Sequence, residues 1–284
     1  MLIHFVKMHG CGNDYIYING FTEKIPAEEK TEFVRRMSDR HFGIGGDGVI
    51  FINPVNGHQA DFEMEMYNAD GSRSQMCGNG IRCVAKFVYD YGLTDSTLIR
   101  IISGGKVKTL ELSVKDAKVE RVRVNMGIPI FDPVQIPVVC EGEEAIAQPI
   151  EVAGKTWLMN CVSMGNPHAV IFVEDVAGMD LEKIGPLFEN HERFPQRVNT
   201  EFARVIDRHR VEMRVWERGS GETLACGTGC CATLAACVRN GLTDRKAILQ
   251  VLGGELEIEW KEETGEIFMT GPAETVFEGT VEYP

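Results

Sequence analysis

Two cysteines occupy the same place in two copies of one motif. Cys77 and Cys226 each follow an aromatic residue by ten positions (77 − 67 = 226 − 216 = 10), and each begins a Cys-Gly-x-Gly sequence. An apolar segment follows in both copies. A thiol is an acid and its thiolate is a base, so a matched pair of cysteines could move protons. The spacing therefore points to acid–base chemistry by two thiols.

The two motifs belong to a longer internal repeat. The offset between the cysteines is 226 − 77 = 149, and the same offset relates residues 92–95 to 241–244, both Gly-Leu-Thr-Asp. It also relates Gly-Gly at 104–105 to Gly-Gly at 253–254. Such a repeat predicts a duplicated lobe. We expect an N-terminal lobe at 1–126 with the first cysteine, a C-terminal lobe at 127–270 with the second, and a tail at 271–284.

Each cysteine is expected to begin a helix inside a curved sheet. Residues 81–91 follow the first motif, and Gly92 stands where a helix would be capped at its C-terminal end. Residues 230–238 follow the second motif and are small or apolar on all sides, so such a helix must be surrounded by protein. Alternating segments typical of strands fill most of the remaining chain. The pattern predicts an α+β fold of two pseudo-symmetric lobes, each with a strongly curved sheet around a central helix.

The start of a helix changes the chemistry of a cysteine. Its partial positive charge favours a thiolate and should lower the thiol pKa from about 8.5 toward neutrality. Its backbone N–H groups also form a site for a carboxylate. An approximate two-fold axis between the lobes would place one ligand carboxylate on the N–H groups of Gly78, Asn79, Gly227 and Thr228.

The carbon next to that carboxylate would then lie between the two sulfur atoms. One thiolate would remove the α-proton from one face, and the opposite thiol would deliver a proton to the other face. The configuration inverts, and the helix ends stabilise the enediolate that forms. This chemistry requires no pyridoxal phosphate, and nothing in the chain marks a particular lysine for a Schiff base. We expect no cofactor.

Other interpretations of the cysteines are weaker. A single buried cysteine is usually a small core residue, but two at equivalent helix starts argue against that explanation. A disulfide between them is expected as a product of oxidation, not as the activity. The spacings Cys77-x5-Cys83 and Cys226-x3-Cys230 do not match the usual zinc motifs, so we expect no metal.

Composition narrows the class of partner. The chain has 284 residues, 44% of them hydrophobic, which suits two medium domains. Its net charge of −13 should repel nucleic acid and anionic membranes. No apolar run is long enough for a membrane span, and residues 1–10 do not match a signal peptide. Nine cysteines without an export signal indicate reduced thiols in the cytoplasm.

Taken together, these residues resemble the diaminopimelate epimerase family. The similarity is carried by Tyr-Asn-Ala-Asp-Gly-Ser at 67–72, Met-Cys-Gly-Asn-Gly at 76–80, Glu-Arg-Gly at 217–219 and Ala-Cys-Gly-Thr-Gly at 225–229. It extends from Lys-Met-His-Gly at 7–10 through Met-Gly-Asn-Pro-His at 164–168 to Met-Thr-Gly-Pro at 269–272. Proline racemases share the two-cysteine logic, but they carry His where Asn79 stands. The pair Glu217-Arg218 also argues against them.

The resemblance implies two lobes, each a curved, mostly antiparallel β-barrel around a helix, with the tail returning to the first lobe. It implies interconversion of LL- and meso-2,6-diaminopimelate for lysine and peptidoglycan synthesis, and it suggests a homodimer. Carried over residue by residue, Cys77 and Cys226 are the acid–base pair, and His168 and Glu217 orient or help deprotonate a thiol. The residues implied to hold the substrate are Asn13, Asn68, Gly78, Asn79, Asn166, Asn199, Glu217, Arg218, Gly227 and Thr228.

Some alternatives stay open at this point. Asn13 lies in a turn between two strands, so it either presents its side-chain amide or merely makes the turn. Gly46-Asp47-Gly48 replaces the Phe-Asp-Gln of many family members, so a substrate contact from that Gln is absent here. A proline or hydroxyproline racemase-type enzyme and a non-catalytic amino-acid-binding protein are the competing functions.

Overall fold

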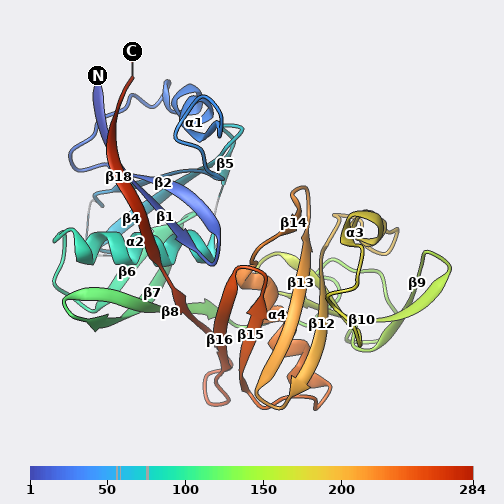
Figure 1. Cartoon of the computed structure of the whole chain (residues 1–284). Helices are drawn as coiled ribbons and strands as arrows, with labels where there is room; N and C mark the ends of the chain where they lie inside the picture. Colours follow the sequence, from blue (N-terminus) through green and yellow to red (C-terminus); the bar gives the residue numbers. More distant parts are fainter. Residues whose placement is uncertain (56, 58, 75–76, 284) are drawn as a thin grey trace. The chain divides into compact units, whose positions relative to one another are not determined.

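The computed structural model describes residues 1–55, 57, 59–74 and 77–283 (Figure 1). Residues 75 and 76 of the first cysteine motif and residue 284 of the expected tail lie outside the described residues. The chain divides into two compact units. Unit 1 comprises Met1–Val124 and Gly271–Pro284, and unit 2 comprises Asn125–Thr270. The division after Val124 comes slightly before the expected lobe boundary at 126.

Unit 1 is built on a sheet that mixes parallel and antiparallel pairs. Its strands follow the order β18-β1-β2-β3-β4-β6-β7-β8, with the short β5 hydrogen-bonded to β4. The pairs β2–β3 and β4–β6 are parallel and the others antiparallel. The strands are β1 (Leu2–Gly10), β2 (Asn13–Asn19), β3 (Gly48–Asn53), β4 (Phe62–Asn68), β5 (Arg73–Ser74), β6 (Leu98–Ser103), β7 (Lys106–Lys115), β8 (Lys118–Gly127) and β18 (Glu274–Glu282).

Unit 2 repeats this topology strand for strand. Its order is β9-β10-β11-β12-β13-β15-β16-β17, with β14 on β13, and its parallel pairs are β11–β12 and β13–β15. The strands are β9 (Gln148–Val152), β10 (Lys155–Ser163), β11 (Pro167–Phe172), β12 (Asn199–Asp207), β13 (Arg210–Glu217), β14 (Gly221–Thr223), β15 (Lys246–Val251), β16 (Gly254–Trp260) and β17 (Ile267–Pro272). The shared topology confirms the α+β fold expected from the repeat.

A buried helix occupies the same place in each unit. Helix α2 (Gly78–Asp90) packs on β1, β2 and β7, and α4 (Gly227–Arg239) packs on β10, β11, β12, β15 and β16. Ten of the 13 residues are buried in each helix. Gly92 follows the Tyr91 cap of α2 with φ of 72°, a left-handed conformation that glycine adopts without a steric cost. Both helices therefore begin, and α2 also ends, as the sequence indicates.

Two shorter helices flank the sheets. In unit 1, α1 (Lys30–Ser38) packs on β3 and β4 and buries Phe33, Val34 and Met37. In unit 2, α3 (Leu181–Glu189) packs on β12, β13 and β14, and Asp180 caps it by accepting a hydrogen bond from Lys183 N. Sequence analysis did not predict α3, which contains Gly185 and Pro186.

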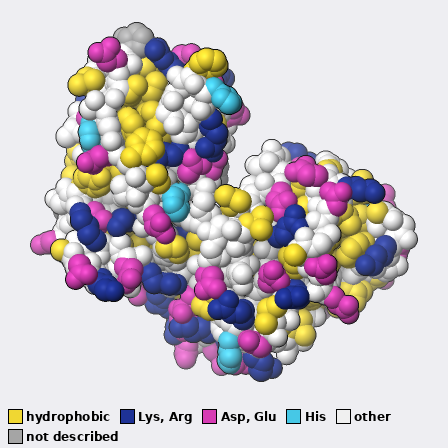
Figure 2. Space-filling view, viewed as in Figure 1, with side chains coloured by type: hydrophobic (Ala, Val, Ile, Leu, Met, Phe, Trp, Pro, Cys, Tyr) yellow, Lys and Arg dark blue, Asp and Glu magenta, His cyan; other side chains and the backbone are white. Residues whose placement is uncertain are grey.

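The surface carries charges of both signs. Figure 2 shows Asp and Glu side chains interspersed with Lys and Arg over the visible face. In the described part of the chain, no helix has the length and apolar character needed to cross a membrane.

The buried cysteines lead to a prediction about alkaline stability. Burial raises the pKa of Cys83 in α2 to about 11 and that of Cys237 in α4 to about 12, from an ordinary 9.0. Above pH 9 the thiols ionise in the unfolded chain but stay protonated in the folded one. The free energy of unfolding therefore falls as pH rises, by up to about 1.4 kcal/mol per pH unit and thiol.

We expect urea unfolding midpoints to drop between pH 8.5 and 11. The double variant Cys83→Ala/Cys237→Ala should show a flatter dependence, because it has lost two of the groups responsible. Equal pH slopes for the variant and the wild type would contradict this assignment.

Candidate active site

Cys77 caps the N-terminus of α2 with its own sulfur. Its backbone is extended (φ −135°, ψ 116°), and its Sγ accepts a hydrogen bond from Gly80 N at 3.2 Å. Its carbonyl accepts from Ile81 N at 2.9 Å, the first turn of the helix. Cysteine thus takes the position that Ser or Asp usually fills in a helix cap. The capping contact holds the sulfur at the positive end of the helix.

Asn13 presents its amide to this thiol. The Sγ of Cys77 donates to Asn13 Oδ1 at 3.0 Å, and Asn13 Nδ2 donates to Asp47 Oδ2 at 2.7 Å. In the turn before Asn13, the residues with positive φ are Cys11 (54°) and Gly12 (82°). Asn13 is therefore not needed to make the turn, and the geometry favours the interpretation that it presents an amide.

Asp47 is a residue that sequence reasoning missed. Its Oδ2 also accepts from Asp14 N at 3.1 Å, and its Oδ1 contacts Arg40 Nη2 at 2.9 Å. Because the carboxylate can only accept, it forces the amide nitrogen of Asn13 toward itself and the amide oxygen toward Cys77. A signal was present in the sequence, since Asp47 is the acidic residue between two glycines directly before β3.

Removal of the Asp47 carboxylate should weaken substrate binding. With Asp47→Ala we expect KM to rise about 10-fold, because a charged hydrogen bond worth about 1.5 kcal/mol no longer orients Asn13. Initial-rate kinetics checks this, with Asp61→Ala as the control. The carboxylate of Asp61 is likewise half-exposed and paired with an arginine. Among the described residues its side-chain partner is Arg100 alone, at 3.2 Å in the same unit. A KM equal to that of the control would count against the role of Asp47.

Two further predicted residues of unit 1 lie beside this group. Asn68 ends β4, pairs in register with Gly48, and donates from Nδ2 to Ser72 Oγ at 3.0 Å. The next residue, Ala69, donates its N–H to the carbonyl of Asp47 at 2.9 Å, which joins this turn to the Asn13 group. Asn79 is buried in the first turn of α2, directly after Gly78.

Cys226 caps α4 in the equivalent way. Its Sγ accepts from Gly229 N at 3.4 Å, its carbonyl accepts from Cys230 N at 2.9 Å, and Thr228 Oγ1 lies 3.5 Å from the sulfur. The residue is only 5% exposed. Gly227 and Thr228 form the first turn of the helix, as Gly78 and Asn79 do in unit 1.

The expectation of a lowered thiol pKa is wrong for Cys226. Burial, followed by the nearby carboxylates Glu217 and Glu201, raises the pKa of Cys226 well above its ordinary value. Hydrogen bonds from Thr228 and Gly229 N act in the opposite direction but are outweighed. Desolvation disfavours the thiolate more than the helix end favours it. Cys226 is therefore a neutral thiol, an acid with a proton to give.

Glu217 lies at the end of β13, next to this thiol. Its Oε1 accepts from Thr223 Oγ1 at 2.5 Å on β14. Burial raises the pKa of Glu217, while hydrogen bonds from Thr223 and Cys226 lower it in part. The carboxyl is thus placed to exchange a proton with the thiol.

Asn199 and Arg218 are held together by a backbone contact. Asn199 begins β12, accepts from Arg218 N at 2.9 Å through Oδ1, and donates to Pro167 O at 2.8 Å through Nδ2. The guanidinium of Arg218 donates to the carbonyl of Gln196 at 2.8 Å. A guanidinium presents five donors, so further ones are available for a carboxylate.

His168 and Asn166 complete the group in unit 2. His168 Nε2 lies 3.0 Å from Asn166 Oδ1, and Asn166 Nδ2 donates to Thr228 Oγ1 at 3.3 Å. On its other side, His168 Nδ1 lies 2.6 Å from Glu201 Oε1. Sequence reasoning missed Glu201, the one acidic residue within the buried start of β12 (residues 199–203). The structure thus gathers the predicted residues of unit 2 around Cys226 and those of unit 1 around Cys77.

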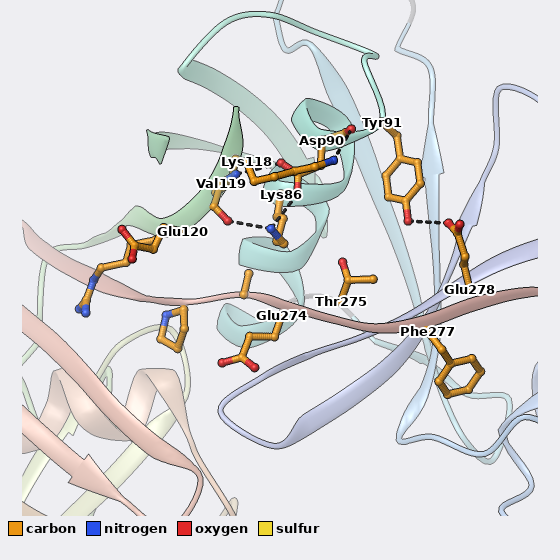
Figure 3. Close-up of a pocket in the computed structure, with 13 residues that line it drawn as sticks. Lys86, Asp90, Tyr91, Lys118, Val119, Glu120, Glu274, Thr275, Phe277 and Glu278 are labelled. Atoms are coloured by element: carbon orange, nitrogen blue, oxygen red, sulfur yellow. Dashed lines mark hydrogen bonds and ion pairs between the residues drawn. The ribbon is translucent and has the colours of Figure 1, made fainter. Parts of the chain in front are cut away.

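Another hollow in unit 1 lies away from these residues. A cavity of about 940 Å³ is lined by the end of α2, by β8 and by β18, and none of the predicted site residues is among its described lining residues (Figure 3). Lys86 bridges Asp90 Oδ2 and the carbonyl of Val119, both at 2.7 Å, and Tyr91 donates to Glu278 at 2.8 Å. These polar groups line the cavity and are already paired with one another. Because the described lining also contains none of the predicted site residues, this cavity is not the candidate site.

No set of three or more metal-binding side chains clusters among the residues that the structure describes. The polar groups beside the two cysteines are amides, a hydroxyl and carboxyl groups. These groups hydrogen-bond one another or the sulfur. The arrangement suits proton transfer at the two thiols and recognition of carboxylate and ammonium groups.

Comparison with known proteins identifies relatives over nearly the whole chain. The sequence model of the diaminopimelate epimerase family matches residues 5–131 and 160–276. A diaminopimelate epimerase of Agathobacter rectalis is 54% identical over 98% of this chain and 99% of its own. One of Acetivibrio thermocellus is 53% identical over 99% of both chains.

Solved structures with much lower identity share the fold. A Bacillus anthracis phenazine biosynthesis protein of the PhzF family has a TM-score of 0.73 at 14% identity and covers 100% of both chains. A hydroxyproline epimerase of Agrobacterium vitis has a TM-score of 0.70 at 13% identity, covering 99% of this chain and 91% of its own.

Proposed function

Because the chain belongs to the diaminopimelate epimerase family, we propose that it interconverts LL- and meso-2,6-diaminopimelate by proton transfer at one α-carbon. The observation that carries this proposal is the equivalence of the two cysteines. Each caps a 13-residue buried helix at the same point of a repeated sheet, with its sulfur on the third N–H of that helix. Inversion needs an acid and a base on opposite faces of a carbon, and two matched thiols supply both.

The raised pKa of Cys226 supports an assignment of the acid and the base. As a buried thiol, Cys226 delivers a proton to one face of the α-carbon. In the same direction of reaction Cys77, after losing to solvent the proton that it donates to Asn13 Oδ1 in this structure, removes the α-proton as a thiolate. Glu217 takes part by exchanging a proton with Cys226 between turnovers. Direct proton transfer of this kind contributes about 10²- to 10⁴-fold to a rate, and electrostatic stabilisation of the enediolate at the helix starts adds to it. The mechanism uses no cofactor and no metal.

The polar residues around each thiol suit a substrate with two carboxylates and two ammonium groups. The N–H groups of Gly78, Asn79, Gly227 and Thr228 would bind the α-carboxylate that becomes the enediolate. Arg218 would fork onto the distant carboxylate, and Glu217 would face an ammonium group. The amides that complete this set are those of Asn13, Asn68, Asn166 and Asn199.

We also propose that the enzyme acts in the cytoplasm as a homodimer. The proposed reaction requires reduced thiols, which the cytoplasm maintains. On β18, Val276 is 55% exposed and Phe277 is 46% exposed, an apolar pair suited to contact with a second copy. Analytical ultracentrifugation of the wild type and of Phe277→Ser would test the dimer, since the variant should sediment as a monomer.

A direct assay tests the activity. The purified protein is incubated with LL-diaminopimelate without added cofactor, and the stereoisomers are separated by chiral chromatography. We expect a mixture of LL and meso forms, and no inversion of L-proline or trans-4-hydroxy-L-proline under the same conditions. Inversion of proline in place of diaminopimelate would overturn the substrate, and binding without inversion would indicate a non-catalytic binding protein.

A further inference from the structure

The turn that carries Arg218 connects β13 to β14. It spans residues 217–220 and is closed by a hydrogen bond from Ser220 N to the carbonyl of Glu217 at 3.0 Å. Gly219 within the turn has φ of 79°, a left-handed value that glycine adopts without a steric cost. The turn by itself does not fix the direction of the Arg218 side chain, because arginine has many rotamers. A defined direction therefore requires contacts from outside the hairpin.

Glu189, the last residue of α3, supplies such contacts from a buried position. Its side chain is 7% exposed. Its Oε2 accepts a hydrogen bond from the indole Nε1 of Trp216 at 2.7 Å, directly before the turn. Its Oε1 accepts from the backbone N–H of Gly219 at 3.0 Å, inside the turn, and from Arg197 Nη1 at 2.9 Å. One carboxylate thus holds the chain on both sides of Arg218.

The contact with Arg197 joins the turn to a neighbouring segment, residues 196–199. This segment also contacts Arg218: the carbonyl of Gln196 accepts from its guanidinium at 2.8 Å, and Asn199 Oδ1 accepts from its backbone N–H at 2.9 Å. Arg197 has φ of 59°, which is unfavourable for a residue with a side chain. A backbone in such a conformation persists only where its surroundings hold it. The ion pair with Glu189 is one of the contacts that do so.

Unit 1 shows that the fold does not require an acid at this place. Its equivalent turn lies at residues 68–71, by the offset of 149, and Ala69 occupies the position of Arg218. The flanking helix is α1, which follows β2 as α3 follows β11. Both helices have nine residues, but α1 ends in Ser38 where α3 ends in Glu189. The buried carboxylate therefore accompanies the turn that presents a guanidinium.

We propose that Glu189 is a positioning residue that aims the guanidinium of Arg218 at the distant carboxylate of the substrate. This deepens the proposed function and rests on it, since Arg218 binds that carboxylate there. Glu189 holds both the turn and the segment 196–199, so the backbone of Arg218 keeps a constant distance from the carbonyl that accepts from its guanidinium. With Nη1 fixed on that carbonyl, the remaining N–H groups have a defined direction toward a carboxylate.

Removal of the carboxylate should weaken binding more than turnover. In Glu189→Ala we expect KM for LL-diaminopimelate to rise about 10-fold, because displacement of a binding group by about 1 Å can cost up to about 100-fold. We expect kcat to stay within about 3-fold, since Cys226 and Glu217 keep their own contacts with Gly229 and Thr223. Glu182→Ala, which removes an exposed acid of the same helix, is the control and should keep the wild-type KM.

An isosteric variant covers the case in which Glu189→Ala does not fold. Glu189→Gln has one acceptor oxygen and one NH₂ donor, so it places a donor against a donor either at Trp216 or at Gly219. Its KM should therefore also rise, and it replaces Glu189→Ala in the comparisons below if circular dichroism shows that the alanine variant is unfolded.

A double-mutant cycle with Arg218→Ala separates positioning from a general loss of structure. In the wild-type background, Glu189→Ala should lower kcat/KM about 10-fold. In the Arg218→Ala background no guanidinium remains to be aimed, so the same substitution should change kcat/KM by less than about 2-fold. A defect unrelated to Arg218 would lower kcat/KM by the same factor in both backgrounds. Equal factors, or an unchanged kcat/KM in the wild-type background, would overturn the proposal.

Nuclear magnetic resonance reports the turn without substrate. In Glu189→Ala the signals of the Trp216 indole N–H and the Gly219 amide should shift, because both lose a carboxylate acceptor. The heteronuclear NOE of the Arg218 amide should fall as the turn loosens on the fast timescale that it measures. Glu182→Ala should leave all of these signals unchanged.

Failure of the proposed function would look different. A wild type that does not invert diaminopimelate would refute the substrate or the reaction, and the amide signals alone would then decide whether Glu189 holds the turn. An Arg218 amide as ordered in Glu189→Ala as in the wild type would overturn the positioning role, whatever the activity.

Discussion

Replacement of Cys226 or of Cys77 by alanine is expected to lower the turnover of LL-diaminopimelate by about 10²- to 10⁴-fold. In the proposed mechanism each variant removes the group that donates or accepts a proton on one face of the α-carbon, and direct proton transfer is worth that much. The substrate should still bind with a similar affinity, because the amides and Arg218 are untouched. Stopped assays with chiral separation, together with calorimetric binding, measure the two effects separately.

The chain offers matched controls for these variants. Cys83 and Cys237 are buried thiols in the same two helices, away from the caps. Cys83→Ala and Cys237→Ala should each keep turnover within about 3-fold and cost about 1–2 kcal/mol of stability through the lost packing. Comparable losses of turnover in these controls would indicate a general packing defect. Full turnover in Cys77→Ala or Cys226→Ala would refute the two-thiol mechanism.

The second large effect is expected for Arg218→Lys. Lysine keeps the positive charge but cannot make two parallel hydrogen bonds to a carboxylate. We expect KM for LL-diaminopimelate to rise about 10- to 100-fold, equivalent to about 1.5–3 kcal/mol, with a smaller change in kcat. Initial-rate kinetics over a range of substrate concentrations resolves the two constants.

Arg210→Lys is the control for this substitution. Arg210 begins β13, the strand that ends directly before Arg218, and pairs with Glu255 at 2.7 Å on the surface. Its replacement should leave both constants unchanged within error, because exposed ion pairs contribute little. An Arg218→Lys variant with the KM of this control would show that Arg218 does not hold a carboxylate.

The sequence alone predicted the features that follow from repetition and helix chemistry. The constant offset of 149 required two equivalent lobes, and Cys-Gly-x-Gly before an apolar segment required a buried helix with a cysteine at its start. The shared topology confirms the first, and the capping contacts of Cys77 and Cys226 confirm the second. These patterns are local or periodic in the sequence, so the features they indicate can be predicted without knowledge of tertiary contacts.

What the sequence did not predict depends on contacts between distant segments. Gly185 and Pro186 both have low helix propensity. The glycine is nevertheless needed in α3, because a Cβ there would lie 2.3 Å from the Trp216 ring. That helix also brings Glu189 to Trp216 Nε1 at 2.7 Å, just before Glu217 and Arg218. Tertiary packing overrode the local propensity.

The direction of the pKa shift of Cys226 also could not be predicted from the local sequence. The helix start suggested a lowered thiol pKa, but burial and two carboxylates raise it. Glu217 was within the motif, whereas Glu201 comes from β12, 25 positions earlier (226 − 201 = 25). Its effect on the thiol depends on distance in space, which a sequence pattern does not give.

The most direct test of the two-thiol account is an initial-rate experiment in D₂O with LL-diaminopimelate. Because separate groups act on the two faces, the meso product should carry one deuterium at the inverted carbon from the first turnover, while recovered LL substrate stays unlabelled. Mass spectrometry of both stereoisomers after chiral separation gives the answer. Product that retains the original hydrogen, or recovered substrate labelled as fast as product forms, would show a single base and contradict the account.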